Sequence, residues 1–457
     1  MADQQQASSS FKVYARWRPL TAIESSTAGF ERNTIESETN SSISISSHVN
    51  TNRTRTWKSD ASFTKVFPET AANSDIFAGV VAPTVPRVMQ GATCNLFAYG
   101  HSGSGKTHTI IGYNYDDSNQ LGLCLGAARR LFEALDQVRT QPVEETRERE
   151  DLGVAVRLYE VRGKHAYDLL NNNIECYIRE GPDGQTHVRG QTETLEDGKV
   201  RVRPIVARPC WCYEEVQEAV RTGLKGRTTG SSSIHDESSR THAVIELEVV
   251  TRRLMDAREE VTARESELVP VGKRATDVYI EEQSKSIIKT PEGKYIPNPG
   301  HPVNQAIIDA AEAEKAEYEN RLRMAEDSVK ACFDSPQNAC LGGKFIFVDL
   351  AGSEYFDAAT STSTSRPKQT TQEQRQGRQI NTDLFALKEV IRAKASKQSR
   401  IPFRASPLTM ILRSHFLAEE REGQSAMILT LSPEEEQFVA TLNTLKYGNL
   451  VGEAGRR

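Results

Sequence analysis

The chain has 457 residues, of which 37% are hydrophobic and 26% are charged, and its formal net charge at pH 7 is −5. This length and composition allow a sizeable buried core, in one large domain or in two or three ordinary ones. Because the chain has no overall basic charge, the composition does not favour nucleic acid as a partner.

The N-terminus, the apolar runs and the cysteines indicate where the protein works. Residues 1–10 are rich in Gln and Ser and lack the basic and apolar regions of a signal peptide, so we expect a disordered leader. No apolar run approaches the roughly 18 residues of a membrane-spanning helix, which predicts no membrane partner. The seven cysteines have no spacing typical of zinc sites or disulfides. We therefore expect a soluble, intracellular protein with reduced thiols.

Strands and helices are interspersed along the first half of the chain. Residues 11–17 alternate like a strand, and 42–46 alternate like a small edge hairpin. Residues 76–90 have helical character that Pro83 and Pro86 should kink or limit. We further expect a buried strand at 95–99, a helix at 122–138, a strand at 154–161, short strands and turns at 171–209, and a helix at 213–224.

The second half contains two clearly predicted strands, 243–250 and 344–350, and the segment between them differs in amino-acid composition. After them we expect a mobile loop at 359–378, helices at 380–395 and 408–418, a strand at 425–431, and a last helix from about Glu436. Strands interspersed with helices are typical of a three-layer α/β domain.

The segment between these strands, residues 251–342, is charged at first and then rich in Ala and Glu. We expect it to be an insertion into the domain. Apolar residues at helical spacing predict a long amphipathic helix with a stripe formed by Ile307, Ala311, Tyr318, Leu322, Ala325, Val329 and Cys332. Glu314 interrupts this stripe. We favour a helix packed on the host domain, with a partner-binding coiled coil as the alternative.

Residues 95–109 hold the most informative motif, because the apolar stretch ending at Tyr99 runs into Gly-His-Ser-Gly-Ser-Gly-Lys-Thr. This loop fits G-x-x-x-x-G-K-T, in which glycines let backbone N–H groups face phosphate oxygens. Lys106 can reach the β- and γ-phosphates, and the Thr107 hydroxyl can bind Mg²⁺. A glycine-rich turn with a chance lysine is the weaker alternative, since all four fixed positions match behind a strand.

Two later stretches, 238–242 and 349–354, indicate what happens to the bound phosphate. Phosphoryl transfer needs further Mg²⁺ ligands, a backbone N–H that senses the γ-phosphate, and a group that positions water. Ser239, Asp349 and Gly352 can supply these. Arg240 and Glu354 can close the site as a charge-assisted pair.

In these motifs the chain resembles a kinesin motor domain, over about residues 11–451. The resemblance is carried by residues 16–19, 98–109, 238–242 and 348–354, and it extends to 380–391, 401–409 and 441–447. It implies a P-loop NTPase fold with a central, mostly parallel or mixed sheet and helices on both faces. It also implies that 452–457 begin a neck or tail.

The resemblance implies an ATPase with ATP and Mg²⁺ as cofactors. The implied nucleotide contacts are Arg16, Arg18, Pro19, Gly100, His101, Ser102, Gly103, Ser104, Gly105, Lys106, Thr107 and His108, with Arg16, Pro19 and His108 around adenine. The implied metal ligands are Thr107, Ser239 and Asp349. The implied catalytic residues are Ser238, Ser239, Arg240, Gly352 and Glu354, with Ser238 placing water and Gly352 contacting the γ-phosphate.

The implied partner is the microtubule, whose acidic tubulin surface would meet the helix that begins near Ile380. A basic cluster is expected to face it, formed by Lys388, Lys394, Lys397, Arg400 and Arg404. The chain also departs from the family pattern. His235 replaces an Asn, Tyr355 an Arg, Thr382-Asp383 a Lys-Ser pair, and Ala405 and Pro407 an Asp and a Lys. Asp383 is thereby expected to add a carboxylate to the microtubule-facing helix.

Residues 159–170 and 387–392 are most similar to the internal-motor kinesins, which depolymerise microtubules, but the Lys-Val-Asp finger of that class is missing between Ser41 and Phe63. The leading hypothesis is a motor domain that couples Mg-ATP hydrolysis to microtubule binding and to movement or end remodelling. The alternatives are a non-motile scaffold or switch and, more weakly, a GTPase. The implied location is the cytoplasm and its microtubules, with the spindle as one option, and a dimer would form through segments outside this chain.

Overall fold

The computed structural model describes residues 11–20, 30–48, 54–140, 151–181, 184, 186–228, 240–334, 339–353, 371–396, 398–413, 416 and 423–454. The chain forms two compact units. The first consists of Met1–Val188, Ile205–Val250 and Cys340–Arg457, and the second of Arg189–Pro204 and Thr251–Ala339. None of the helices in these described ranges is long and apolar enough to cross a membrane.

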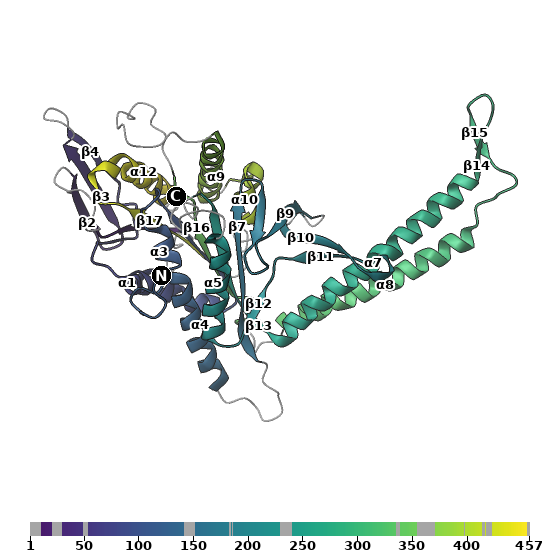
Figure 1. Cartoon of the computed structure of the whole chain (residues 1–457), viewed down its shortest axis with the longest axis horizontal. Coiled ribbons are helices and arrows are strands. Elements are labelled where there is room, and N and C mark those ends of the chain that lie inside the picture. The colour runs from purple at the N-terminus through teal and green to yellow at the C-terminus, as the bar shows by residue number, and fades with distance from the viewer. Residues whose placement is uncertain are drawn as a thin grey trace, which may run out of the picture. The chain divides into compact units, whose positions relative to one another are not determined.

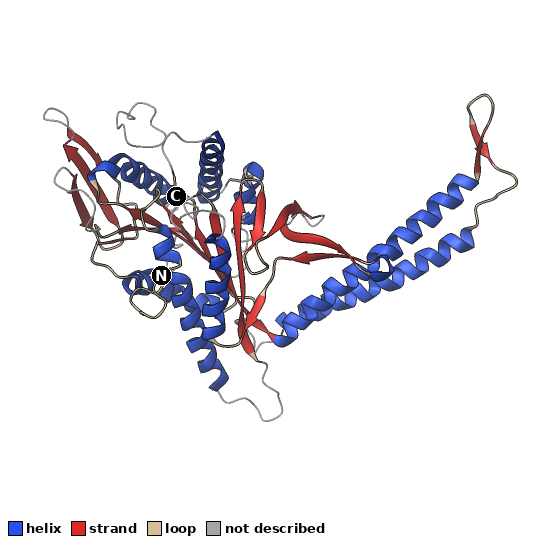
Figure 2. Cartoon of the chain, viewed as in Figure 1, coloured by secondary structure: helices blue, strands red, loops and turns tan. Residues whose placement is uncertain are grey.

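A mixed β-sheet forms the centre of the first unit (Figure 2). From its interior to the edge strand β5, the spatial order is β7 (Leu152–Arg162), β13 (His242–Thr251), β16 (Lys344–Asp349), β6 (Thr93–Tyr99), β17 (Gln424–Leu431), β1 (Phe11–Trp17) and β5 (Lys65–Phe67). The five from β16 to β5 are parallel to their neighbours, and β13 runs antiparallel to β16. Beside β7 lie the antiparallel strands β8 (His165–Asp168), β9 (Ile174–Glu180) and β12 (Arg208–Cys210).

Helices cover both faces of this sheet, so the three-layer α/β fold expected from the sequence is confirmed (Figure 1). One face carries α4 (Leu123–Thr140), α5 (Tyr213–Thr228) and the broken helix from α1 (Asn73–Ile76) to α2 (Val85–Val88). The other carries α9 (Thr371–Ala395), α10 (Pro407–Ile411) and α12 (Phe438–Ala454).

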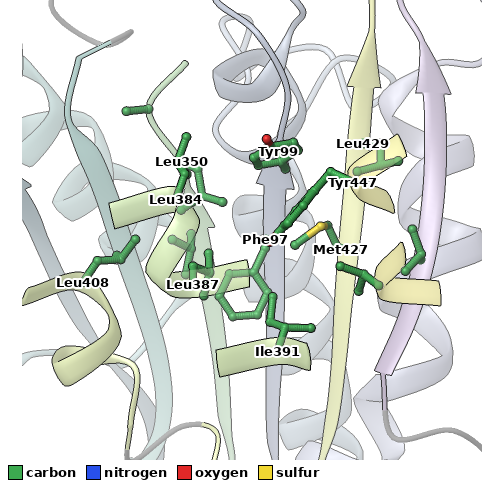
Figure 3. Close-up of a cluster of buried hydrophobic side chains, with 14 of the residues drawn as sticks. Phe97, Tyr99, Leu350, Leu384, Leu387, Ile391, Leu408, Met427, Leu429 and Tyr447 are labelled. Atoms are coloured by element: carbon green, nitrogen blue, oxygen red, sulfur yellow. The ribbon is translucent and has the colours of Figure 1, made fainter. Parts of the chain in front are cut away.

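Strand β6 shows how the sequence builds these two layers. Because side chains alternate along a strand, Leu96 and Ala98 pack into the α4 layer while Phe97 and Tyr99 pack into the α9 layer. Figure 3 shows Phe97 among buried side chains from α9, α10, β17 and α12, which it labels as Leu384, Leu387, Ile391, Leu408, Met427, Leu429 and Tyr447. A strand that is buried on both faces has a continuous apolar sequence, and this run allowed β6 to be predicted as a buried strand.

Several predicted elements need correction. Residues 42–46 belong to the middle strand of a separate three-stranded antiparallel sheet, β2 (Phe30–Glu36), β3 (Ser41–His48) and β4 (Thr54–Lys58), rather than to an edge hairpin. Helix α9 begins at Thr371, so part of the expected loop 359–378 is helical, and its other residues lie outside the described ranges. The helix expected over 76–90 is present in pieces, because Pro83 and Pro86 each lie at the start of a new segment.

The second unit is built on two long antiparallel helices, α7 (Arg252–Lys285) and α8 (Gln305–Phe333). A short hairpin, β14 (Ile287–Lys289) and β15 (Tyr295–Pro297), lies between them in sequence, and β11 (Val200–Pro204) packs on α7. The sequence predicted α8 but assigned no element to α7, whose apolar stripe is sparse among charged residues and ends in buried Val271 and Ala275.

The predicted inward stripe of α8 is mostly correct. Ala325 and Cys332 are buried, but Ile307 is 48% exposed and its neighbour Ile308 is buried in its place. Glu314, which interrupts the stripe, faces α7 and forms an ion pair with Arg274 at 2.9 Å. Within this unit α8 therefore packs against α7.

None of the seven cysteines, all of which lie in the described ranges, forms a disulfide. Six are buried, including Cys332 in the second unit, and only Cys212 is exposed.

Candidate functional site

The P-loop (residues 100–107) connects the end of β6 to α3 (Lys106–Ile110). Gly105 precedes the helix with φ +99°, a left-handed conformation that favours glycine. A Cβ on Gly100 would lie 2.5 Å from the backbone oxygen of Thr430, so the loop's first glycine is required by close packing on β17. Ser104 also contacts the Thr430 hydroxyl at 2.7 Å, which fixes the loop against the sheet.

Lys106 lies inside this loop and is buried. Its Nζ donates to the backbone oxygens of Gly100 at 3.0 Å and His101 at 2.8 Å. His101 is buried as well, and desolvation, followed by the charge of Lys106, lowers its pKa to about 4. The imidazole is therefore neutral at pH 7, and the ammonium of Lys106 is the positive charge at the centre of the loop.

The first helical turn of α3 meets the end of β16 at a hydroxyl–carboxylate contact. Thr107 Oγ1 donates to Asp349 Oδ2 at 2.8 Å, and Asp349 is almost completely buried. Its Oδ1 has no hydrogen-bond partner among the described residues. A hydroxyl beside a buried carboxylate oxygen that can still accept is a ligand set that Mg²⁺ prefers, so these two residues fit the metal. Ser239, the third expected ligand, lies outside the described residues.

Arg227, near the C-terminal end of α5, joins this site, although the sequence did not single it out. Its guanidinium donates to Asp349 Oδ2 at 3.2 Å and to the backbone oxygen of Thr241 at 3.2 Å, and its Nε lies 3.6 Å from Glu160 Oε2. Thr241 Oγ1 also donates to Glu160 at 3.0 Å. The sequence around Arg227 has no pattern that predicts this role, because the residues that Arg227 contacts lie in other parts of the chain.

The end of β1 approaches the other side of α3. Arg16 is buried and donates to Thr109 Oγ1 at 2.7 Å, and burial lowers its pKa to about 10, so it stays charged at neutral pH. Arg18 donates to Ser432 at 3.1 Å and to the oxygen of Pro19 at 3.1 Å. His108 lies 5.7 Å from the Tyr113 ring, centroid to centroid, and its pKa is lowered first by burial and then by the charge of Arg16.

The segment after β16 lies directly against the P-loop. Ser353 N donates to the oxygen of Gly100 at 3.1 Å. A Cβ on Gly352 would lie 2.9 Å from the backbone nitrogen of Ser102, which only a glycine avoids. Among the remaining predicted catalytic residues, Arg240 is partly buried at the start of the β13 region, and Ser238, Ser239 and Glu354 lie outside the described residues. The same is true of His235 and Tyr355.

The predicted basic surface is less uniform than expected. Arg404 forms a two-pronged ion pair with Glu180 at 2.8 and 2.9 Å, and Arg413 binds the same carboxylate at 2.9 Å. Lys394 donates to the oxygen of Phe416, Lys388 lies 5.8 Å from the Tyr447 ring, and Arg400 is exposed. Lys397 lies outside the described residues.

Asp383 is not on this surface, which corrects the expectation that it adds a carboxylate there. It is only 1% exposed, because α9 turns it toward the sheet. The outward residues of α9 instead include Arg378, Thr382, Phe385 and Arg392. The loss of a lysine at Thr382 remains, but no negative charge is gained on the outward surface at position 383.

Comparison with known proteins gives a consistent result. A family model described as "Kinesin motor domain" matches residues 16–272 and 322–453. Kinesin-like protein KIF24 of Homo sapiens is 26% identical over 391 residues, which cover 86% of this chain and 20% of that protein. Kinesin-like protein KIN-13A of Oryza sativa subsp. japonica is 28% identical over 394 residues, covering 86% of this chain and 35% of that protein. The chain thus spans between a fifth and about a third of these relatives.

Solved structures support the fold. The motor domain of the Saccharomyces cerevisiae kinesin-related protein Kar3 superposes with a TM-score of 0.58 at 20% identity, covering 96% of this chain and 99% of that chain. The C-terminal motor and motor homology domain of Kar3Vik1, fused to a synthetic coiled coil, gives a TM-score of 0.59 at 19% identity and covers 97% of this chain and 85% of that chain.

Proposed function

The chain belongs to the kinesin motor domain family, a family of ATPases that act on microtubules, and from this premise we propose that it hydrolyses Mg-ATP and couples hydrolysis to microtubule binding. The observation that carries the proposal is the arrangement around the P-loop. Thr107 contacts Asp349 at the end of β16, and Gly352 lies against the backbone of Ser102, which supports a phosphate site shared by the P-loop and the residues after β16.

Each residue of the site has a proposed task. Lys106 holds the β- and γ-phosphates, while the N–H groups of the P-loop and the start of α3 face them. Thr107 and Asp349, together with Ser239, would hold Mg²⁺, which would supply positive charge beside the phosphate oxygens. Arg16 and His108 lie on the side where the resemblance puts adenine, with Arg18 and Pro19 behind them. Ser238 positions the attacking water.

Gly352 is proposed to connect hydrolysis to movement. Its N–H would bond the γ-phosphate and lose that bond after hydrolysis, which would change the contact of residues 350–353 with the P-loop. Helix α9 and the basic residues near α10 would then change their contact with the microtubule, so the proposed site of action is the microtubule cytoskeleton. Any dimerisation is proposed to involve segments outside this sequence.

Steady-state ATPase measurements at low salt, with and without microtubules, test this proposal. We expect slow basal turnover that rises with microtubule concentration, and no turnover for Lys106→Ala. Intact basal turnover without any stimulation would reject the coupling and favour a non-motile switch. Undetectable turnover with normal ATP binding would reject the enzymatic proposal itself, and equal competition by GTP would reject the preference for ATP.

A further inference from the structure

Two buried polar side chains, His242 and Asp383, lie close to each other between β13 and α9. His242 is the first residue of β13 and is 2% exposed, and Asp383 lies in the middle of α9 and is 1% exposed. Their Nε2 and Oδ2 atoms are 3.9 Å apart. Neither residue belongs to the proposed phosphate or metal contacts, and burying both is costly unless they interact.

The hydrogen bond on the other side of the His242 ring fixes its tautomer. The N–H of Ala351 donates to Nδ1 at 3.0 Å, so the proton of the neutral ring is on Nε2. Burial, followed by the charges of Arg227 and Lys106, lowers the pKa of His242 to about 3, which keeps the ring neutral. Nε2 finds no hydrogen-bond partner within the described part of the chain, and Asp383 Oδ2 lies 3.9 Å from it.

Asp383 is held from two other sides. Its Oδ1 accepts from Gln379, one turn earlier in α9, at 3.1 Å, and the side chain of Ser406, which caps α10, lowers the pKa of the carboxyl. Burial raises the pKa of Asp383 to about 6, so the group is mostly ionised at neutral pH. Gln379, Ser406 and neutral His242 are the groups that face it, and none of them carries a compensating positive charge.

We propose that His242 and Asp383 are positioning residues that connect the Ala351–Gly352 backbone to α9 through a hydrogen bond that closes when the helix shifts by about 1 Å. The inference rests on the proposed function and adds to it the route by which this chain transmits the state of the phosphate site. In the family pattern that the chain resembles, the residue at position 383 is a Ser. A serine hydroxyl is shorter and uncharged, and it could not form a charge-assisted bond across the same gap.

Hydrogen exchange tests the connection without requiring turnover. In the unsubstituted chain, changing ADP for a non-hydrolysable ATP analogue should change amide exchange both in residues 100–110 and in α9. In Asp383→Asn the change in 100–110 should persist and the change in α9 should fall at least about threefold, because the amide loses the charged acceptor. Glu389→Gln, which removes a carboxylate from the same helix, is the matched control and should behave as the unsubstituted chain.

A double-mutant cycle tests whether the two residues act together. We expect Asp383→Asn and His242→Asn each to lower the microtubule-stimulated kcat about tenfold, with the KM for ATP changed less than about twofold. The double variant should be no slower than the slower single variant, since both remove the same bond. If Asp383→Asn does not fold, Asp383→Ser, the family residue, replaces it in both experiments.

The possible failures are distinguishable. If the nucleotide changes exchange in neither region of the unsubstituted chain, the proposed function fails. If residues 100–110 respond while α9 responds equally in the unsubstituted chain and in Asp383→Asn, the connection is overturned and the proposed function stands. The connection would also be overturned if the effects of the two substitutions on kcat were fully additive.

Discussion

The nucleotide site and the outward surface of α9 use charged residues in opposite ways. At the site, Lys106, Asp349 and Arg227 are buried, and each bonds groups from other elements. On the surface, Arg400 is exposed and Arg404 shares Glu180 with Arg413. Removing one partner from a buried pair costs several kcal/mol, whereas an exposed ion pair contributes about 0–1 kcal/mol. We therefore expect the loss of one buried charge to have a large effect, whereas affinity at the surface is the sum of many small contributions.

The largest expected effect is at the buried lysine. Lys106→Ala should lower ATP affinity at least about 100-fold, because it removes a charge-assisted contact to two phosphates. Calorimetric titration with Mg-ATP measures this, with exposed Lys58→Ala on β4 as the control. An ATP affinity that stays in the micromolar range would contradict the larger effect expected from a buried charge than from an exposed one.

Gly352→Ala should separate binding from turnover. The added Cβ would press on the backbone of Ser102, which cannot move away as a flexible side chain can. We expect ATP affinity within about threefold of the unsubstituted chain and turnover lowered about tenfold, the loss of one transition-state hydrogen bond. Gly272→Ala in α7, where a Cβ meets open space, is the control. Unchanged hydrolysis would remove Gly352 from the mechanism.

Asp383→Asn should increase stability above neutral pH. The folded-state pKa of about 6 exceeds the ordinary value of 3.8, so the folded chain binds the proton more tightly and loses stability as the pH rises from about 4 through 6. Above that window the ionised carboxylate costs about 2–3 kcal/mol, part of which the amide recovers. Urea unfolding at pH 8 should give a gain of about 1–2 kcal/mol. At pH 4 or below the gain should vanish, and an equal gain at both pH values would contradict this account.

Substitutions on the surface should have modest and salt-dependent effects. Arg400→Ala should weaken microtubule co-sedimentation about two- to fivefold at low salt and less at high salt. Arg404→Ala should weaken co-sedimentation less, because the ion pair with Glu180 already offsets the positive charge of Arg404. A larger loss from the Arg404 variant would mean that the pair opens on the microtubule.

Removal of the inserted segment should have the smallest effect on either region. Val249 and Gly342–Gly343 already bond across β13 and β16, at 2.9 Å for both hydrogen bonds, so a short Asn-Gly linker can replace residues 251–341. We expect ATP affinity within about twofold, since loop length contributes little to stability. Residues 189–204, which lose α7 as a packing partner, should become sensitive to proteases. An insoluble product would show that the segment is part of the core.

The same contrast explains how far the sequence could be interpreted. The P-loop and the strands around it were predictable because glycine positions and apolar runs are local and depend on backbone geometry. Asp383 was misplaced because it was assigned from the family pattern, although it lies three residues after Ile380 and four before Leu387, on the apolar face of α9. Arg227 and the Arg404–Glu180 pair depend on contacts between residues far apart in the chain, and α7 was missed because its apolar residues are sparse.

The distribution of cysteines gives each compact unit its own reporter of local opening. Cys212 is exposed and should react with a thiol reagent immediately, and alkylating it first leaves only buried thiols. Burial raises the pKa of Cys94, Cys124, Cys176, Cys210 and Cys340 in the first unit, so these react only when their surroundings open. Cys332 lies in the second unit. The labelling rates of the two sets, followed by mass spectrometry without denaturant, therefore measure the opening free energies of the two units separately.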